Sequence, residues 1–135
     1  MSAQVIVDTS ALVALLRGEE DAPRFARALA ARGLPKRISA ANFLETAIVI
    51  DGSRDAIASR RLDEVVAKAN LTIEAVTSEQ AHVARAAYRD FGKGSGHPAQ
   101  LNFGDCFAYA LAKATGEPLL FKRQDFGLTD IRPQR

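Results

Sequence analysis

Four acidic residues stand at separate points of the chain, each beside the expected end of a strand or start of a helix. They are Asp8, Glu45, Asp105 and Asp125. Mg²⁺ and Mn²⁺ prefer oxygen ligands and keep several waters, so carboxylates gathered from distant segments can hold such an ion against a substrate phosphate. The spacing therefore predicts a carboxylate-bound divalent metal site and an enzyme that cuts phosphodiesters.

Two of these acids also stand where acids commonly cap helices. Asp8 lies at an expected strand-to-helix junction, although Thr9 or Ser10 can take the capping role and leave Asp8 free for a ligand. Asp105 follows Asn102 by three residues, the spacing of a capping box at the positive end of a helix dipole. A first-turn acid can still be a rigid metal ligand, so both interpretations stay open.

The other two acids have equally ordinary explanations. Glu45 belongs to an expected helix, where a glutamate usually lies on a solvated face. Asp125 precedes Phe126 and Gly127 in a segment typical of a turn, and Asp130 is an equally eligible acid nearby. Taken singly, neither residue identifies a site.

Short apolar runs alternate with helical periodicity, which predicts an α/β protein. The expected strands cover Gln4–Val7, Arg37–Ser39, Leu71–Val76 and Leu119–Phe121. The expected helices run from Thr9 or Ser10 to Gly18, from Pro23 past Leu29, through Phe43–Ile48, over Arg54–Ala69, from Thr77 to Phe91 and from Asn102 to Lys113. Such alternation is typical of a mostly parallel sheet, which places ligands beyond the carboxyl ends of its strands.

Two of the expected helices show apolar residues at helical spacing, which predicts one apolar face on each helix. The first face consists of Phe43, Leu44, Ala47 and Ile48, and the second of Ile57, Leu62, Val65 and Val66. The glycine-rich segment Gly92–Pro98 predicts a loop, but it lacks the lysine and hydroxyl residue of a P-loop.

The composition favours one compact domain over residues 1–135. The chain is 47% hydrophobic and 25% charged, and its net charge of +2 is compatible with a phosphate-bearing partner without identifying one. Cys106 is the only cysteine, so no intramolecular disulfide can form. No signal peptide or membrane-spanning run is evident, and we expect a cytoplasmic protein without a membrane partner.

Histidine and cysteine chemistry is poorly supported. His82 and His97 show no paired spacing with another histidine or a cysteine, which argues against zinc. Cys106 lies in an apolar helix and is expected in the core rather than as a nucleophile.

Several segments together resemble the PIN domain, and specifically the VapC class of toxin ribonucleases. They are VIVDTSALVALL, ANFLET, YRDFGKGSGHPAQLNFGDCFAYALAK and PLLFKRQDFGLTDI, and they cover nearly the whole chain. The resemblance implies an α/β PIN-like fold with a mostly parallel central sheet flanked by helices. It also implies a Mg²⁺-dependent endoribonuclease, a homodimer, neutralisation by a VapB-type antitoxin and, as a class-level substrate, transfer RNA.

The resemblance also assigns roles to individual residues. It makes Asp8, Glu45, Asp105 and Asp125 the catalytic acids, with Asp8 and Asp105 as the principal metal ligands and Ser10 and Asn102 as supporting residues. The family usually has a glycine before the last acid, where this chain has Arg123.

The expected mechanism is in-line attack of a metal-activated water on an RNA phosphodiester, with Mn²⁺ as a plausible substitute for Mg²⁺. Glu45 and Asp125 hold a second ion or orient its waters. The candidate contacts for RNA phosphates are Arg17, Lys93, Lys122 and Arg123, although isolated basic residues are more often solvated surface.

Three other functions remain open on the sequence. A non-catalytic RNA-binding module fits the basic charge, but there is no tryptophan and no stretch of interleaved basic and aromatic residues. A Mg²⁺-dependent phosphatase could use Asp8 as nucleophile, but Ser10 stands where that family has a second aspartate. A purely partner-binding protein could use its apolar helix faces.

Overall fold

The central sheet is parallel, so the carboxyl ends of its strands lie on the same side of the molecule. The computed structural model describes residues 4–122 and 124–134, without the side chains of residues 124 and 125. Its strands are β1 (Val5–Val7), β2 (Lys36–Ser39), β3 (Leu71–Glu74) and β4 (Leu119–Leu120), in the order β3-β2-β1-β4. All three neighbouring pairs are parallel, which confirms the predicted sheet.

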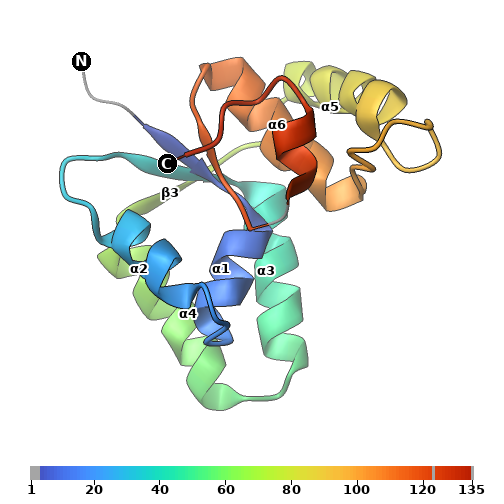
Figure 1. Cartoon of the computed structure of the whole chain (residues 1–135). Coiled ribbons are helices and arrows are strands. Elements are labelled where there is room, and N and C mark those ends of the chain that lie inside the picture. The colour runs from blue at the N-terminus through green and yellow to red at the C-terminus, as the bar shows by residue number, and fades with distance from the viewer. Residues whose placement is uncertain (1–3, 123, 135) are drawn as a thin grey trace.

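Helices cover both faces of this sheet. They are α1 (Thr9–Leu16), α2 (Ala22–Ala30), α3 (Ala40–Gly52), α4 (Ala56–Lys68), α5 (Ser78–Phe91) and α6 (Phe103–Thr115), followed by the short 3₁₀ helix η1 (Gln124–Leu128). Figure 1 shows α1 to α4 on one side and α5 and α6 on the other. In the described residues, no helix is long and apolar enough to cross a membrane.

The central strand β1 divides the hydrophobic core into two halves. Its middle residue Ile6 packs with residues of α5 and α6, whereas Val5 and Val7 pack with residues of α1 and α2. All three are fully buried, as expected for a parallel strand covered on both faces. Asp8, which follows directly, is therefore held at the carboxyl end of the most buried strand.

The predicted elements are all present, with shifts at their ends. Strand β2 begins one residue earlier than predicted, at Lys36, and β3 ends at Glu74 instead of Val76. Helix α4 begins at Ala56, because Asp55 caps it through the backbone N–H groups of the first turn. Strand β4 stops at Leu120.

Two of the four predicted apolar positions of α3 are wrong, whereas Phe43 and Ala47 pack against the core. Leu44 and Ile48 have 57% and 63% of their surface exposed, and the buried residues of α3 are Asn42, Thr46 and Ile50. The face of α3 turned inward meets α1 and α6 at the acidic residues, and it carries hydrogen-bonding side chains there. Leu44 and Ile48 are consequently left on the outside.

The predicted apolar face of α4 is also wrong at one position. Ile57 is 69% exposed, whereas Leu62 is buried and Val65 and Val66 pack against the core as predicted. Ile57 lies in the first turn of α4, beyond the part of the helix that the core covers.

Candidate active site

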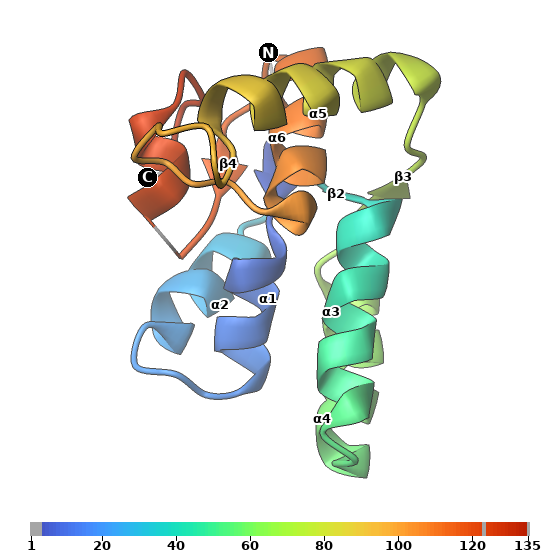
Figure 2. The ribbon, with the colours of Figure 1, turned by 90° about the vertical axis from the view of Figure 1, so that its right-hand side faces the viewer.

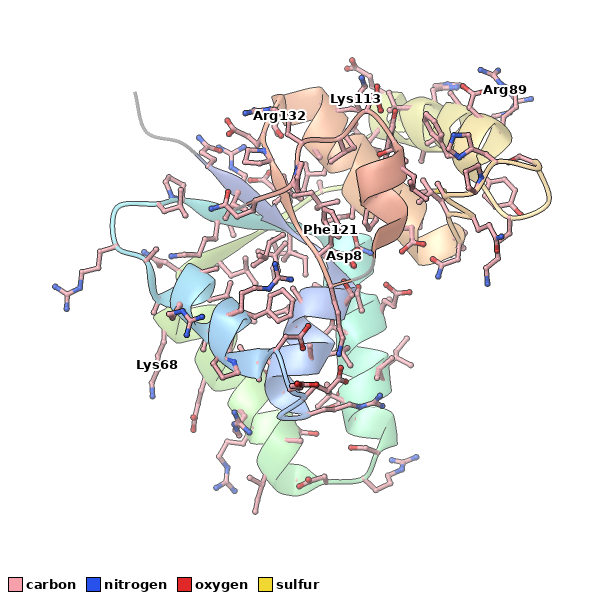
Figure 3. The ribbon with its side chains drawn as sticks, viewed as in Figure 1. Asp8, Lys68, Arg89, Lys113, Phe121 and Arg132 are labelled. Atoms are coloured by element: carbon pink, nitrogen blue, oxygen red, sulfur yellow. The ribbon has the colours of Figure 1, made fainter. Side chains whose placement is uncertain are left out.

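Asp8 lies where β1 ends and α1 begins (Figure 3). Its side chain is only 2% exposed, and its Oδ2 accepts hydrogen bonds from the Ser10 backbone N–H at 3.0 Å and from the Ser10 hydroxyl at 2.5 Å. Asp8 is therefore itself the cap of α1, and the expectation that Thr9 or Ser10 caps this helix is wrong. Both of these hydrogen bonds engage Oδ2.

The electrostatic environment of Asp8 shows that two other acids lie nearby. Burial raises the pKa of Asp8 from 3.8 to about 7, and the negative charges of Asp105 and Glu45 add to this rise, while the Ser10 hydrogen bonds oppose it. A carboxyl group with such a pKa is about half protonated at neutral pH. A cation placed among these three acids would favour its ionised form.

Asp105 is held rigidly at the start of α6. The backbone N–H of Asn102 donates to Asp105 Oδ2 at 2.9 Å, and the backbone N–H of Asp105 donates to Asn102 Oδ1 at 2.9 Å. These reciprocal bonds form the predicted capping box. Asp105 is 8% exposed, so its cap role coexists with a position close enough to act on Asp8.

Glu45 lies on α3 and points toward the same region. Its Oε1 accepts from the Thr9 hydroxyl at 2.5 Å and from Asn42 Nδ2 at 3.3 Å. The side chain is partly buried rather than on a solvated face. Three acids, one directly after β1, one on α3 and one on α6, therefore converge at the carboxyl end of the sheet.

Among the described side chains, no group of three or more His, Cys, Asp or Glu residues is arranged closely enough to form a ready metal cage. Each of the three acids is instead engaged by hydrogen-bond donors of its own. The side chain of the fourth predicted acid, Asp125, lies outside the described residues.

The predicted supporting residue Ser10 also connects the site to the segment after β4. Its hydroxyl accepts from the Lys122 backbone N–H at 3.0 Å while donating to Asp8. Ser10 thus fixes Asp8 relative to the chain that leads to Asp125.

The predicted RNA-contacting residues have different surroundings. Arg17 is exposed directly after α1, and Lys93 lines a cleft of about 520 Å³ between α5 and α6. The Lys122 ammonium forms ion pairs with Glu19 and Asp21. Arg123 lies outside the described residues.

Cys106 is a core residue, as predicted. It is 5% exposed, and burial followed by the charge of Asp105 raises the pKa of its thiol to about 11. A thiol with that pKa stays protonated at neutral pH and is a poor nucleophile.

Glu45 is surrounded by three residues that the sequence did not predict as part of the site, namely Thr9, Asn42 and Gly104. Asn42 precedes Glu45 by three residues on one helix, a spacing that places the two side chains on the same face. That spacing was a usable signal for Asn42. Nothing in the sequence indicated that Thr9 and Gly104 contact Glu45 on α3, because Thr9 lies more than 30 residues and Gly104 nearly 60 residues from Glu45 along the chain.

The comparisons with known proteins agree with one another. The family model of the PIN domain matches residues 5–131. Ribonuclease VapC28 of Mycobacterium tuberculosis is 56% identical over 128 residues, covering 95% of this chain and 96% of the relative. Ribonuclease VapC42 of the same species is 48% identical over 129 residues, covering 96% and 98%.

Solved structures show the same fold. VapC20 of Mycobacterium tuberculosis, described as a toxin that cleaves the sarcin-ricin loop, superposes with a TM-score of 0.75 at 18% identity, covering 97% of this chain and 98% of that one. VapBC2 of Rickettsia felis, bound to a DNA fragment from its promoter, gives a TM-score of 0.73 at 13% identity with 97% of each chain covered. With a PIN-domain match over nearly its whole length and ribonuclease relatives at about half identity, the chain belongs to the VapC ribonucleases of the PIN domain family.

Proposed function

We propose that this VapC ribonuclease cuts RNA phosphodiester bonds with a divalent metal ion held by Asp8 and Asp105, assisted by Glu45 and Asp125. The observation that carries the proposal is the buried Asp8 carboxyl group, whose pKa is raised to about 7 beside Asp105 and Glu45. Gathering like charges in a buried place disfavours folding unless a cation offsets them. A metal ion is the simplest such cation.

The residues present fit a hard divalent ion. The donor atoms of the three converging acids are carboxylate oxygens. Such oxygens suit Mg²⁺ and Mn²⁺ better than zinc or copper, which prefer histidine nitrogen and cysteine sulfur. When bound, such an ion lowers the pKa of a coordinated water and offsets charge on the phosphoryl oxygens. Ser10 keeps Asp8 oriented, Asn102 keeps Asp105 oriented, and Thr9 keeps Glu45 oriented.

The RNA strand is proposed to bind through phosphate contacts beside these acids. Arg17 and Lys93 are exposed cations available for such contacts. Lys122 has to break its ion pairs with Glu19 and Asp21 before it can contact a phosphate. The first phosphate contacts are therefore proposed to come from Arg17, Lys93 and Arg123. VapC20 is described as a toxin that cleaves the sarcin-ricin loop, and our proposed substrate for this chain is an RNA such as transfer RNA.

The biological setting is proposed to be a toxin–antitoxin module in the cytoplasm. The solved relatives include a toxin–antitoxin complex of Klebsiella pneumoniae, which supports a VapB-type antitoxin as the partner of this chain. Residues 1–135 are proposed to form one PIN domain that carries both the nuclease site and the surface that the antitoxin covers.

A second copy of the chain is proposed to cover an apolar face, which consists of Leu44, Ile48, Tyr88, Phe103 and Phe107. The first four are 57%, 63%, 47% and 79% exposed, and Phe103 and Phe107 form an edge-to-face pair. They lie on α3, α5 and α6, which Figure 2 shows next to one another and which pack α3 on α6 and α5 on α6. Tyr88, Phe103 and Phe107 also line one cleft. Exposed apolar side chains gathered in this way are typical of a protein–protein interface.

Replacing Phe103 by glutamate is expected to turn the dimer into a monomer, because a charge at the centre of an apolar interface loses its hydration without a partner. Light scattering after size-exclusion chromatography measures the mass. Ile57→Glu, at an apolar position on α4 that is 69% exposed, is the matched control and should remain a dimer. A wild-type protein that is monomeric at micromolar concentration would contradict the homodimer.

Cleavage of total RNA by the purified chain tests the activity. We expect discrete fragments with Mg²⁺ or Mn²⁺, none with EDTA, and loss of cutting when the cognate antitoxin is added. RNA binding without metal-dependent cutting would favour the non-catalytic module. A phosphoryl group trapped on Asp8 would favour the phosphatase.

A further inference from the structure

Three residues from different segments surround the Glu45 carboxylate. The Thr9 hydroxyl, in the first turn of α1, lies 2.5 Å from Oε1 and 3.2 Å from the backbone oxygen of Asn42. The Asn42 side chain donates to Oε1 at 3.3 Å and to the backbone oxygen of Gly104 at 2.9 Å. One carboxylate oxygen is therefore held by two donors, and one of these donors is itself anchored on α6.

The orientation of the Asn42 amide follows from its partners. Asn42 is fully buried, and its Nδ2 faces two acceptors, Glu45 Oε1 and the Gly104 carbonyl. Exchanging the nitrogen and oxygen would place three acceptors together without a donor. Its own Oδ1 is buried and finds no hydrogen-bond donor among the described residues. Asn42 thus leaves one hydrogen-bonding atom unsatisfied while it holds Glu45.

Gly104 makes room for the same carboxylate. A Cβ atom built on Gly104 would lie 2.6 Å from Glu45 Oε1 and closer still to Oε2. Both distances are well below any real contact of a Cβ atom, and Gly104 has no left-handed backbone that would require glycine. A side chain at the second residue of α6 would therefore collide with Glu45, and glycine keeps this space open for the carboxylate.

We propose that Thr9, Asn42 and Gly104 are positioning residues that fix Glu45 at the N-terminus of α6, beside Asp105. Two donors hold Oε1, so Oε2 is the oxygen that Glu45 offers to a metal ion or to a water bound to it. The positive end of the α6 dipole favours the ionised carboxylate at this place. The inference rests on the proposed function, because it assigns Glu45 a role in that metal site.

A double-mutant cycle between Gly104→Ala and Glu45→Ala tests whether Gly104 acts through Glu45. The four proteins are compared by Mn²⁺ affinity from calorimetry, by RNA cleavage and by melting temperature without metal. In the presence of Glu45, Gly104→Ala should weaken Mn²⁺ binding and slow cleavage about tenfold or more, because the new methyl group displaces the carboxylate. In the Glu45→Ala background the same change should alter Mn²⁺ affinity less than about twofold.

The melting temperatures give a readout that needs no activity. In the Glu45→Ala background, Gly104→Ala should raise the melting temperature through its helix propensity, whereas beside Glu45 it should lower it. Gly52→Ala, another glycine in a helix but with open space around it, is the matched control. It should raise the melting temperature slightly and leave Mn²⁺ affinity and cleavage unchanged.

Thr9 offers an independent arm. Thr9→Val keeps the shape but removes the donor and should weaken Mn²⁺ binding, while Thr9→Ser keeps the hydroxyl and should restore it. Equal losses from Gly104→Ala with and without Glu45, or equal behaviour of the valine and serine variants, would overturn the inference. A wild-type protein that neither binds Mn²⁺ nor cuts RNA would overturn the proposed function first, and the inference with it.

Discussion

Asp8→Asn is expected to abolish RNA cleavage and, at the same time, to make the metal-free protein more stable at neutral pH. The loss of cleavage follows because an amide cannot supply the negative charge that a metal ligand needs. The gain in stability follows because Asp8 is 2% exposed and stands near the charges of Asp105 and Glu45, which together with burial raise its pKa to about 7. Asparagine is neutral at every pH, and its side-chain oxygen can still accept the Ser10 hydrogen bonds.

The pH dependence of stability has a definite sign. The unfolded chain loses the Asp8 proton near pH 3.8, whereas the folded chain keeps it until about pH 7. Between these values the folded state binds more protons, so this group's contribution to stability is complete below pH 3.8 and is lost as the pH rises to about 7. The difference between the two pKa values of Asp8 corresponds to a free energy of about 4 kcal/mol. Because the site can relax, we expect Asp8→Asn to raise the free energy of unfolding by about 1 to 3 kcal/mol at high pH.

Urea unfolding of the metal-free protein at several pH values measures this effect. Asp8→Asn should show a higher free energy of unfolding than wild type above pH 7 and little difference below pH 4. The matched control is Asp63→Asn, the same chemical change on the exposed face of α4. It should leave both cleavage and the pH profile unchanged. A folded Asp8→Asn protein that cuts RNA at the normal rate would refute the assignment of Asp8.

The part of the site that follows from local sequence could be predicted. A β-branched run that ends in Asp8 indicates a buried parallel strand with a carboxylate at its end, and Asn102 with Asp105 has the spacing of a capping box. Both features depend on residues within three positions of each other. The structure contains both, and it adds that Asp8 serves as the cap of its own helix.

The arrangement around Glu45 could not be predicted in the same way. Thr9 and Gly104 lie 36 and 59 residues from Glu45 along the chain, as the residue numbers show. The apolar spacing of α3 predicted one face of Phe43, Leu44, Ala47 and Ile48. Leu44 and Ile48 are exposed, and Asn42 and Thr46 are buried instead. Apolar periodicity identifies an inner face only when burial is the sole demand on a helix, and α3 also has to present polar side chains to the site.

The affinity for Mn²⁺ is expected to strengthen as the pH rises through neutrality and to level off above about pH 8. The physical reason is competition between the metal ion and a proton for the same carboxylate. With the pKa of Asp8 raised to about 7 in the metal-free protein, the ion must displace this proton at lower pH. Loss of one proton on binding predicts a change in the apparent dissociation constant of about tenfold per pH unit below the pKa.

Calorimetry between about pH 5.5 and about pH 8.5, in buffers of different ionisation enthalpy, measures both the affinity and the number of protons released. Glu20→Gln, a neutralised exposed acid outside the site, should reproduce the wild-type slope. Asp8→Asn should bind Mn²⁺ more weakly, and its affinity should depend less on pH, because the carboxylate for which the metal ion and the proton compete is gone. Since Asp105 and Glu45 both raise the pKa of Asp8, neutralising either of them should shift the wild-type curve toward lower pH. A wild-type affinity that is flat across this range would mean that Asp8 does not hold the metal ion.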